Sequence, residues 1–103
     1  MNAEIEAKLK TLPKTPGVYL MKNAQGKIIY VGKALALKNR VSSYFQHGRK
    51  DPKTAALVAE IADFDYILVS TELEALILEC NMIKRYAPYY NIMLRDDKHY
   101  PYI

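Results

Sequence analysis

Two short apolar runs near the start of the chain flank a polar stretch. The runs cover residues 17–22 and 28–32, and the polar stretch 23–26 between them ends in glycine. This pattern predicts a β-hairpin. With a loop of four residues, Tyr19 pairs with Tyr30, and both tyrosine side chains lie on one face because side chains alternate along strands.

The opposite face of the predicted hairpin is apolar. Under the same pairing Leu20 lies opposite Ile29 and Val18 lies opposite Val31, so this face forms core. Gly17 and Gly32 flank the end of the face that carries the tyrosines, and we expect a backbone segment or a ligand to approach closely there, because glycine has no side chain.

The rest of the chain shows helical periodicity and one further strand, without repeats. Helical spacing of apolar residues predicts helices at residues 2–12, 37–45, 53–62 and 72–87. The β-branched and aromatic stretch 65–71 predicts a third strand. The tyrosine-rich tail 89–103 follows neither period, and we expect it to be irregular.

Length and composition restrict the class of protein. A chain of 103 residues forms one domain with one core, and 50% hydrophobic with 25% charged residues is ordinary for a soluble globular protein. The formal net charge of +4 is compatible with an anionic partner. A single cysteine excludes an internal disulfide framework and fits a reducing compartment.

The two ends and the hydropathy of the chain bear on its location. Acidic residues near the start speak against a signal peptide, and no apolar stretch approaches the length of a membrane span. We therefore expect a cytoplasmic protein without membrane contact. The apolar end at residues 100–103 predicts that residues 1–103 are one domain, excised as an N-terminal fragment of a larger protein.

Glu79 is the unusual residue of the helix predicted at 72–87. Thr71 and Glu74 form a capping box, and Glu72 favours the helix dipole, so these residues have structural roles. The neighbours of Glu79 at helical spacing are apolar, and none is a charge partner. A carboxylate in such surroundings needs a partner, which a metal ion or a catalytic role would supply. Alternatively, it reaches solvent at the helix edge or pairs with a lysine from elsewhere.

Arg40 and Tyr44 are a second candidate pair. They lie one helical turn apart and project together from one flank of their predicted helix. The planar arginine fork suits phosphate oxygens, and Lys33 follows the hairpin directly. Each residue alone is better explained by a solvent-exposed basic helix face with a partly buried tyrosine, but together with the tyrosine pair and the helical glutamate they favour a site.

The order and spacing of several motifs are more specific than any single residue. The motifs are Gly17-Val18-Tyr19, Tyr30-Val31-Gly32-Lys33-Ala34, Arg40, Tyr44-Phe45, Ala75–Glu79, Ile83-Lys84, Pro88–Ile92 and Lys98–Tyr102. Over nearly the whole chain this set resembles the GIY-YIG endonuclease family, and within it the N-terminal domains of UvrC proteins. Valine stands in the middle of both signature tripeptides, a change that removes no reactive group.

The resemblance implies an α+β fold, a small three-stranded antiparallel sheet flanked by helices, and hydrolysis of a DNA phosphodiester. It implies one divalent cation, Mg²⁺ or Mn²⁺, with Glu79 as its sole protein ligand. Tyr30 resembles the group that activates the attacking water, and Arg40 the cation that holds the scissile phosphate. Supporting catalytic positions fall on Tyr19, Gly32, Lys33, Tyr44 and Asn91.

Partners follow from the same resemblance and from the basic residues. Contacts to the DNA backbone, independent of base sequence and sensitive to salt, are expected from Lys33, Arg40, Lys50, Lys53, Lys84 and Arg95. The implied substrate is damaged duplex DNA held by UvrB, reached through the parent protein and cut on the 3′ side of the lesion. We expect the isolated domain to be monomeric.

Two other classes of function remain open. The first is a non-catalytic nucleic-acid-binding module on the same fold, and the second is a protein-interaction domain. A binding module has no need of a metal-binding glutamate, so the presence of Tyr30, Arg40 and Glu79 together speaks against the first alternative.

Overall fold

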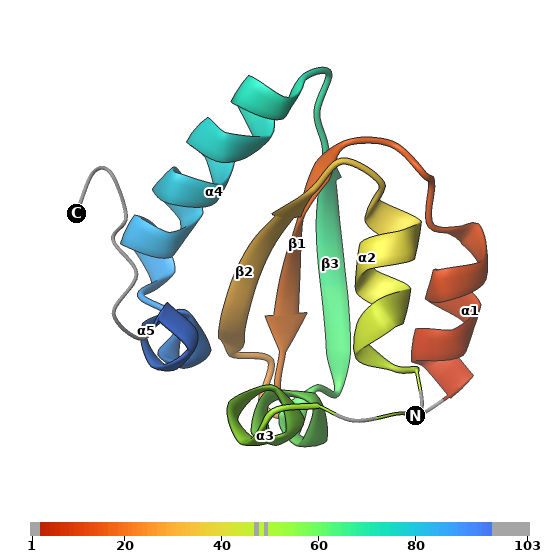
Figure 1. Cartoon of the computed structure of the whole chain (residues 1–103), viewed down its shortest axis with the longest axis vertical. Helices are drawn as coiled ribbons and strands as arrows, with labels where there is room; N and C mark the ends of the chain where they lie inside the picture. Colours follow the sequence, from red (N-terminus) through yellow and green to blue (C-terminus); the bar gives the residue numbers. More distant parts are fainter. Residues whose placement is uncertain (1–2, 47, 49, 96–103) are drawn as a thin grey trace.

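A three-stranded antiparallel sheet forms the centre of the molecule in the computed structural model, which describes residues 3–46, 48 and 50–95 (Figure 1). Its strands are β1 (Gly17–Lys22), β2 (Ile28–Ala34) and β3 (Asp63–Leu68), in the order β2-β1-β3. Strand β1 is therefore hydrogen-bonded along both sides, and β2 and β3 are the sheet edges. The expected sheet flanked by helices is confirmed.

Helices cover both faces of the sheet. The described residues form α1 (Ala3–Thr11), α2 (Leu37–Tyr44), α3 (Pro52–Glu60), α4 (Glu72–Tyr86) and α5 (Tyr89–Arg95). In Figure 1, α4 lies on one side of the sheet, and α1 and α2 lie on the other. Helices α3 and α5 contact each other at the end near the hairpin turn. No helix among the described residues is long and apolar enough to cross a membrane.

The pairing of β1 with β2 differs by two residues from the expected register. Tyr19 lies opposite Gly32, and Met21 lies opposite Tyr30. The expected pair of Tyr19 with Tyr30 is therefore wrong. A shift by an even number of residues leaves every side chain on its face of the sheet. The two tyrosines still share one face, where they are diagonal neighbours, with ring centroids 6.2 Å apart.

The turn of the hairpin accounts for one residue of this shift, and a β-bulge beside it accounts for the other. It runs from Asn23 to Lys27, one residue longer than expected. The Asn23 N–H donates to the Lys27 carbonyl at 3.0 Å, and the Asn23 Oδ1 accepts from the N–H groups of Gln25 and Lys27, both at 3.0 Å. Gly26 has a φ of +79°, which glycine adopts without strain. An asparagine side chain thus replaces part of the strand ladder and moves the register.

A β-bulge next to the turn changes the apolar pairs as well. The register shifts at the end of β1, which leaves Ile29 without an opposite residue. Both expected pairs on this face are wrong, because Val31 lies opposite Leu20 instead of Val18. Ile29 belongs to the core on the α1 and α2 side, whereas Val31 belongs to the core under α4.

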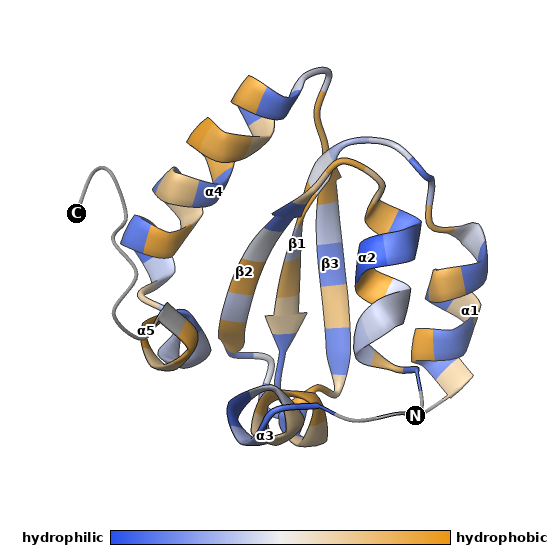
Figure 2. Ribbon diagram, in the orientation of Figure 1, coloured by the Kyte–Doolittle hydropathy of each residue, from blue (hydrophilic) through white to orange (hydrophobic). Residues whose placement is uncertain are grey.

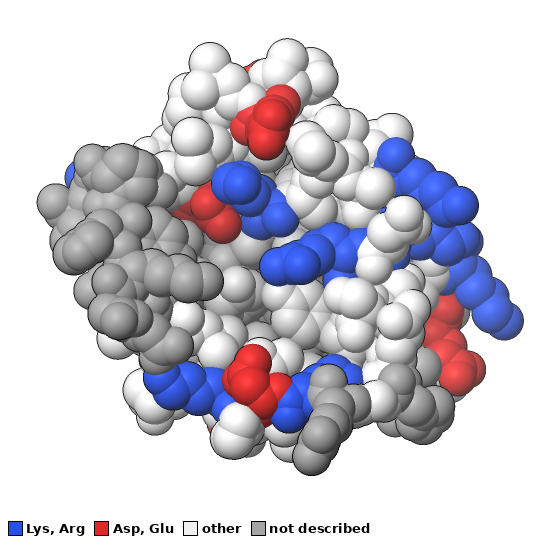
Figure 3. Space-filling view, viewed as in Figure 1, with Lys and Arg blue, Asp and Glu red and all other residues white. Residues whose placement is uncertain are grey.

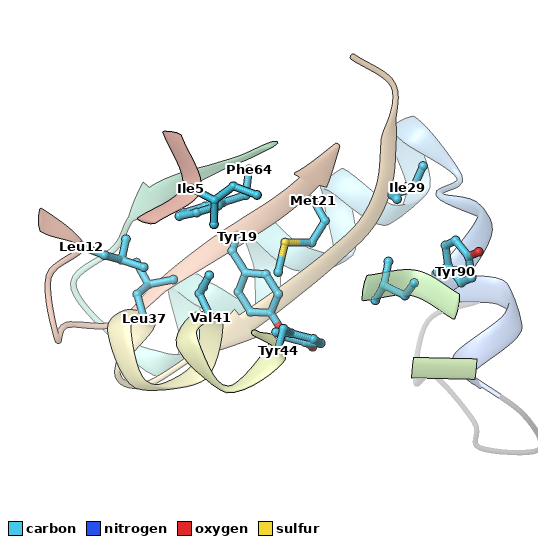
Figure 4. Packing of buried hydrophobic residues seen from close by; sticks show 11 residues of the cluster. Ile5, Leu12, Tyr19, Met21, Ile29, Leu37, Val41, Tyr44, Phe64 and Tyr90 are labelled. Carbon is cyan, nitrogen blue, oxygen red and sulfur yellow. The ribbon is translucent and has the colours of Figure 1, made fainter. Parts of the chain in front are cut away.

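The two faces of the sheet bury clusters of different size. The larger cluster fills the side of α1 and α2 and includes Ile5, Tyr19, Val41, Tyr44 and Phe64. Figure 4 shows the Tyr19 and Tyr44 rings meeting between the sheet and α2, so the aromatic residues extend the core directly.

The cluster under α4 is small. Its fully buried members are Val18, Leu20, Val31 and Ala75. Hydrophobic residues occur in each turn of α4 in Figure 2, yet within the described chain Ala75 is its one buried residue. Helix α4 therefore packs on β2 and β1 through Ala75 and the partly buried Leu78, Met82 and Ile83.

The end of the described chain is helical, against the expectation of an irregular tail. Helix α5 spans seven residues and follows Pro88. It is held by polar side chains, since the Tyr90 hydroxyl donates to the Glu60 carboxylate of α3 and Asn91 binds β2. Residues 96–103 of the predicted tail lie outside the described residues.

Candidate active site

Three tyrosines from three elements pack around one another. Tyr19 of β1, Tyr30 of β2 and Tyr44 of α2 have ring centroids 5.8–6.3 Å apart, at tilted angles. The hydroxyls of Tyr19 and Tyr44 share a hydrogen bond of 2.7 Å. Tyr19 is 1% exposed and Tyr44 is 8% exposed, whereas Tyr30 is half-buried. Tyr30 is therefore the phenol of this cluster that a substrate reaches most easily.

Burial sets the charge state of the two inner phenols. Burial raises the pKa of Tyr19 to about 12, and the neighbouring Tyr30 adds to this rise. Burial also raises the pKa of Tyr44, and its proximity to Tyr19 acts in the same direction. Both phenols stay protonated at neutral pH, so they can donate hydrogen bonds but are unsuited to accept a proton from water.

Gly32 makes room for this cluster. A Cβ atom added to Gly32 would overlap the phenol ring of Tyr19, its partner across the strands. Only glycine fits there, because a side chain would push the Tyr19 ring away from Tyr44. At Gly32 the expectation of a ligand or backbone is wrong, since the group that approaches is an aromatic side chain, but at Gly17 the backbone carbonyl of Ile67 approaches as expected.

Arg40 lies on the exposed flank of α2 beside the tyrosines. Its guanidinium carbon is 5.9 Å from the centroid of the Tyr44 ring. A hydrogen bond with Tyr19 is the main cause that raises the pKa of Arg40. The phenols thus hold one side of a permanent cation in place, and its exposed side is available to an anion.

Glu79 projects from α4 and is half-buried. Burial raises the pKa of its carboxyl, and the charge and backbone N–H of Lys33 offset only part of the rise. None of the salt bridges between described residues involves Glu79. Of the alternatives for this residue, full exposure does not apply, and the nearest lysine acts on it without forming an ion pair.

The donor set around Glu79 suits one particular kind of metal site. No group of three or more His, Cys, Asp or Glu side chains comes together in the described part of the chain. A single carboxylate is a hard oxygen ligand, and Mg²⁺ commonly binds proteins through one or two carboxylates while keeping several waters. Glu79 therefore fits Mg²⁺ or Mn²⁺, and a bound cation would offset the cost of its half-buried charge.

Asn91 of α5 binds the outer edge of β2. Its side-chain amide donates to the Val31 carbonyl and accepts from the Val31 N–H, each at 2.8 Å. The side chain is nearly inaccessible, with Asn91 3% exposed. It satisfies both backbone groups of an edge residue as a neighbouring strand would. Because Val31 lies between Tyr30 and Gly32, Asn91 is a positioning residue for that segment.

The basic residues expected to contact DNA fall into different places. Lys33 and Arg40 line one groove of about 530 Å³, and Arg40 also lines a second of about 440 Å³ together with Lys50 and Lys53. Figure 3 shows basic side chains near the middle of this face and along its lower edge. Lys84 is exposed in the last turn of α4 and lines neither groove. The side chain of Arg95 lies outside the described residues.

Sequence reasoning missed two residues with a part in this arrangement. Ser43 lines both grooves, and its hydroxyl donates to the Arg40 carbonyl at 2.6 Å. Its position three residues after Arg40 on an amphipathic helix was the available signal. Tyr90 fixes α5 through Glu60, and no pattern in the sequence connects these two residues.

Comparison with known proteins agrees with this geometry. Residues 15–92 match the family model of the UvrC-like GIY-YIG domain. UvrABC system protein C of Thermoanaerobacter sp. (strain X514) is 61% identical over 100 residues, which are 96% of this chain and 16% of that protein. The protein of the same name from Clostridium botulinum (strain Hall) is 60% identical over 101 residues, 97% of this chain and 16% of that protein. The chain thus spans a small part of these relatives.

A solved structure covers the same region. The GIY-YIG N-terminal endonuclease domain of UvrC from Thermotoga maritima, bound to its catalytic divalent cation magnesium, is 42% identical with a TM-score of 0.78. The match covers 88% of this chain and 99% of that one. An asparagine-to-alanine mutant of that domain, also bound to its catalytic divalent cation, has a TM-score of 0.77 at 41% identity. This chain belongs to the UvrC-like GIY-YIG domain family.

Proposed function

We propose that this domain hydrolyses a phosphodiester bond of DNA with the help of one divalent cation bound by Glu79. The observation that carries the proposal is the contrast between two neighbouring charges. Arg40 is a cation held by phenols with one side open, and Glu79 is a half-buried carboxylate without an ion pair. A phosphodiester would supply an anion for Arg40, and a metal ion would supply a cation for Glu79. The solved relative from Thermotoga maritima is described as an endonuclease domain with a catalytic cation, in support.

Arg40 has the role of binding the scissile phosphate. Attack by water adds negative charge to the phosphoryl oxygens, and a preorganised guanidinium stabilises that charge more in the transition state than in the ground state. The Tyr44 ring lies beside the guanidinium and Tyr19 interacts favourably with its charge, which favours one orientation of the group. When bound, the cation at Glu79 supplies Lewis-acid stabilisation of the phosphoryl oxygens and of the leaving 3′ oxygen.

Tyr30 has the role of accepting a proton from the attacking water. A free tyrosine has a pKa of about 10, so it needs nearby positive charge to work at neutral pH. Arg40 lines the same groove as Tyr30, and Lys33 is three residues along β2. Tyr19 and Tyr44 remain protonated because burial raises the pKa of each. They hold the Tyr30 ring and Arg40 in place, while Lys33 orients the water.

The decisive test compares the wild type with Glu79→Gln. Cleavage of a damaged duplex is measured in Mg²⁺ and in Mn²⁺, with the complete repair machinery present. Glutamine keeps the size of the side chain but removes its charge, so the variant is expected to lose incision while its fold persists. Glu4→Gln on the exposed face of α1 is the matched control and should cut like the wild type. Equal cleavage by the wild type and Glu79→Gln would refute the metal-site assignment.

The wider role follows from the relatives and belongs to the same proposal. We infer that the chain is the nuclease part of a longer cytoplasmic repair protein and makes the 3′ incision in nucleotide excision repair. Its identity of 61% with a UvrABC system protein C, of which it spans 16%, supports this inference. Damaged duplex DNA bound to UvrB would be the substrate, presented with help from the rest of the parent protein, and the isolated domain would be a monomer.

A further inference from the structure

Two grooves meet at Arg40. One contains Lys33 and Asn39, and the other opens between α2 and α3 and contains Tyr30. Arg40 and Ser43 line both grooves, so the guanidinium stands at their junction. If Arg40 holds the scissile phosphate, a bound strand has a groove available on each side of that phosphate.

The groove between α2 and α3 has a basic wall that the catalytic residues do not account for. Lys50 and Lys53 line it together with Arg40, Tyr30 and Tyr44. Both lysines are half-buried, and the Lys50 ammonium donates to the Gln46 carbonyl at 2.7 Å. Lysine stems that pack along a groove while their charged ends remain near its surface are suited to follow a phosphate backbone.

One acidic residue stands within the same wall. The Asp51 carboxylate accepts hydrogen bonds from the Thr54 N–H at 2.8 Å and the Thr54 hydroxyl at 3.0 Å. These bonds lower the pKa of Asp51, so it is charged at neutral pH. The carboxylate is needed as the N-cap of α3, but its charge works against an anion in the groove.

We propose that the groove between α2 and α3 binds the DNA strand next to the scissile phosphate, with Lys50 and Lys53 contacting a neighbouring phosphate. This assignment rests on the proposed function of Arg40 and extends it along the strand. The contacts go to the backbone, so binding is independent of base sequence and falls with salt. Asp51 limits the affinity, which suits a domain that must release its product strand.

The test measures binding without cleavage. A fluorescent single-stranded oligonucleotide of about twelve nucleotides, long enough to fill a typical single-strand site, is titrated with the whole chain in EDTA at several salt concentrations. Loss of one phosphate contact should lower the slope of log affinity against log salt by about 0.7. Lys50→Ala and Lys53→Ala are each expected to show this loss. Lys27→Ala, an exposed lysine at the tip of the hairpin, is the matched control and should keep the wild-type slope.

Asp51→Asn is a useful test because the expected result is tighter binding, which a variant that fails to fold would not show. Asparagine is as good an N-cap as aspartate, so α3 should persist, while the negative charge disappears from the groove wall. Binding of the oligonucleotide should become about 2- to 5-fold tighter at low salt. Unchanged or weaker binding by Asp51→Asn, or wild-type slopes for both lysine variants, would overturn the proposal.

The outcome is separable from that of the proposed function. If Glu79→Gln loses incision but the lysine variants bind like the wild type, the nuclease site stands and the groove assignment fails. If Glu79→Gln cuts normally while the lysine variants show the lower salt slope, the groove assignment stands as a nucleic-acid site and the catalytic proposal fails.

Discussion

The two faces of the sheet differ in how their buried polar groups are satisfied. On the side of α1 and α2, burial keeps the phenols of Tyr19 and Tyr44 neutral, and they satisfy each other through one hydrogen bond. On the side of α4, burial acts on Glu79, and its pKa rise is only partly offset by Lys33. The two inner phenols have each other as hydrogen-bond partners, while no salt bridge between described residues involves the Glu79 carboxylate. Under the proposed function, substitutions in the tyrosine cluster should therefore affect activity through the geometry of the site, and substitutions of Glu79 through the binding of the cation.

Removal of the Tyr30 hydroxyl should have the largest effect on activity. Tyr30→Phe keeps the aromatic packing with Tyr19 and Tyr44 but removes the hydroxyl that we propose accepts the proton from water. Cleavage should fall by about 10²- to 10⁴-fold, the range of general-base catalysis, with little change in DNA binding. Incision rate and oligonucleotide affinity are measured in parallel. Tyr66→Phe, at an exposed position on β3, should leave both unchanged, and full incision by Tyr30→Phe would reject the assignment.

Gly32→Ala tests how tightly the tyrosine cluster is packed. The added methyl group must displace the Tyr19 ring or bend β2, which should cost about 1–3 kcal/mol of unfolding free energy. Urea denaturation measures this cost. In a Tyr19→Ala background the space is empty, so the same substitution should cost much less, and the two changes should be strongly non-additive. Additive costs would show that the strand itself, and not the ring, resists the methyl group.

Asn91→Ala separates positioning from packing at the edge of β2. It leaves the Val31 N–H and carbonyl without their partner, at a cost of about 1–3 kcal/mol in unfolding free energy. Because the freed segment carries Tyr30, kcat should fall more than KM rises. Asn81→Ala, an exposed asparagine on α4, should change neither. A loss of stability with unchanged kcat would make Asn91 a purely structural residue.

The hairpin shows why part of the fold could be predicted from the sequence and part could not. Apolar runs and glycine located both strands, and the face shared by Tyr19 and Tyr30 survived a wrong register because the slip was even. One residue of the slip came from the longer turn, which the Asn23 side chain closes through hydrogen bonds that no apolar pattern encodes, and the other came from the β-bulge. The bulge at Ile29 then moved one residue to the other core.

Contacts between segments that are far apart in the sequence are the part of the site that could not be predicted. Spacing along one helix was enough to single out Glu79 as a carboxylate without a local partner, and its half-burial agrees. Helix α5 was missed because it is short and its anchors are polar bonds to groups far away in the chain. Asn91 meets Val31 across 60 positions, and Tyr90 meets Glu60 across 30. Periodicity describes burial on one element, so it cannot report such pairs.

The smallest expected effect is the change in stability caused by Glu79→Gln. It should distinguish the two faces of the sheet most clearly, because its sign depends on whether Mg²⁺ is present. The pKa of Glu79 is raised in the folded state, so in metal-free protein its contribution to stability is greatest below the unfolded pKa and is lost as pH rises through the folded pKa. At pH 7 Glu79→Gln should therefore be slightly more stable than the wild type, by less than about 1 kcal/mol because solvent screens a half-exposed group.

Excess Mg²⁺ should reverse this order. Binding to the folded wild type adds stability that grows with the logarithm of the cation concentration, and the variant lacks the ligand that would produce it. Thermal unfolding at pH 7, with and without Mg²⁺, measures both differences, and Glu4→Gln should respond to Mg²⁺ like the wild type. Tyr44→Phe, on the other face, should shift stability by the same amount in both conditions. If Mg²⁺ reverses the order of stability of the wild type and Glu79→Gln but not that of the wild type and Tyr44→Phe, the cation binds at Glu79. If Mg²⁺ leaves both stability differences unchanged, the cation does not bind at Glu79.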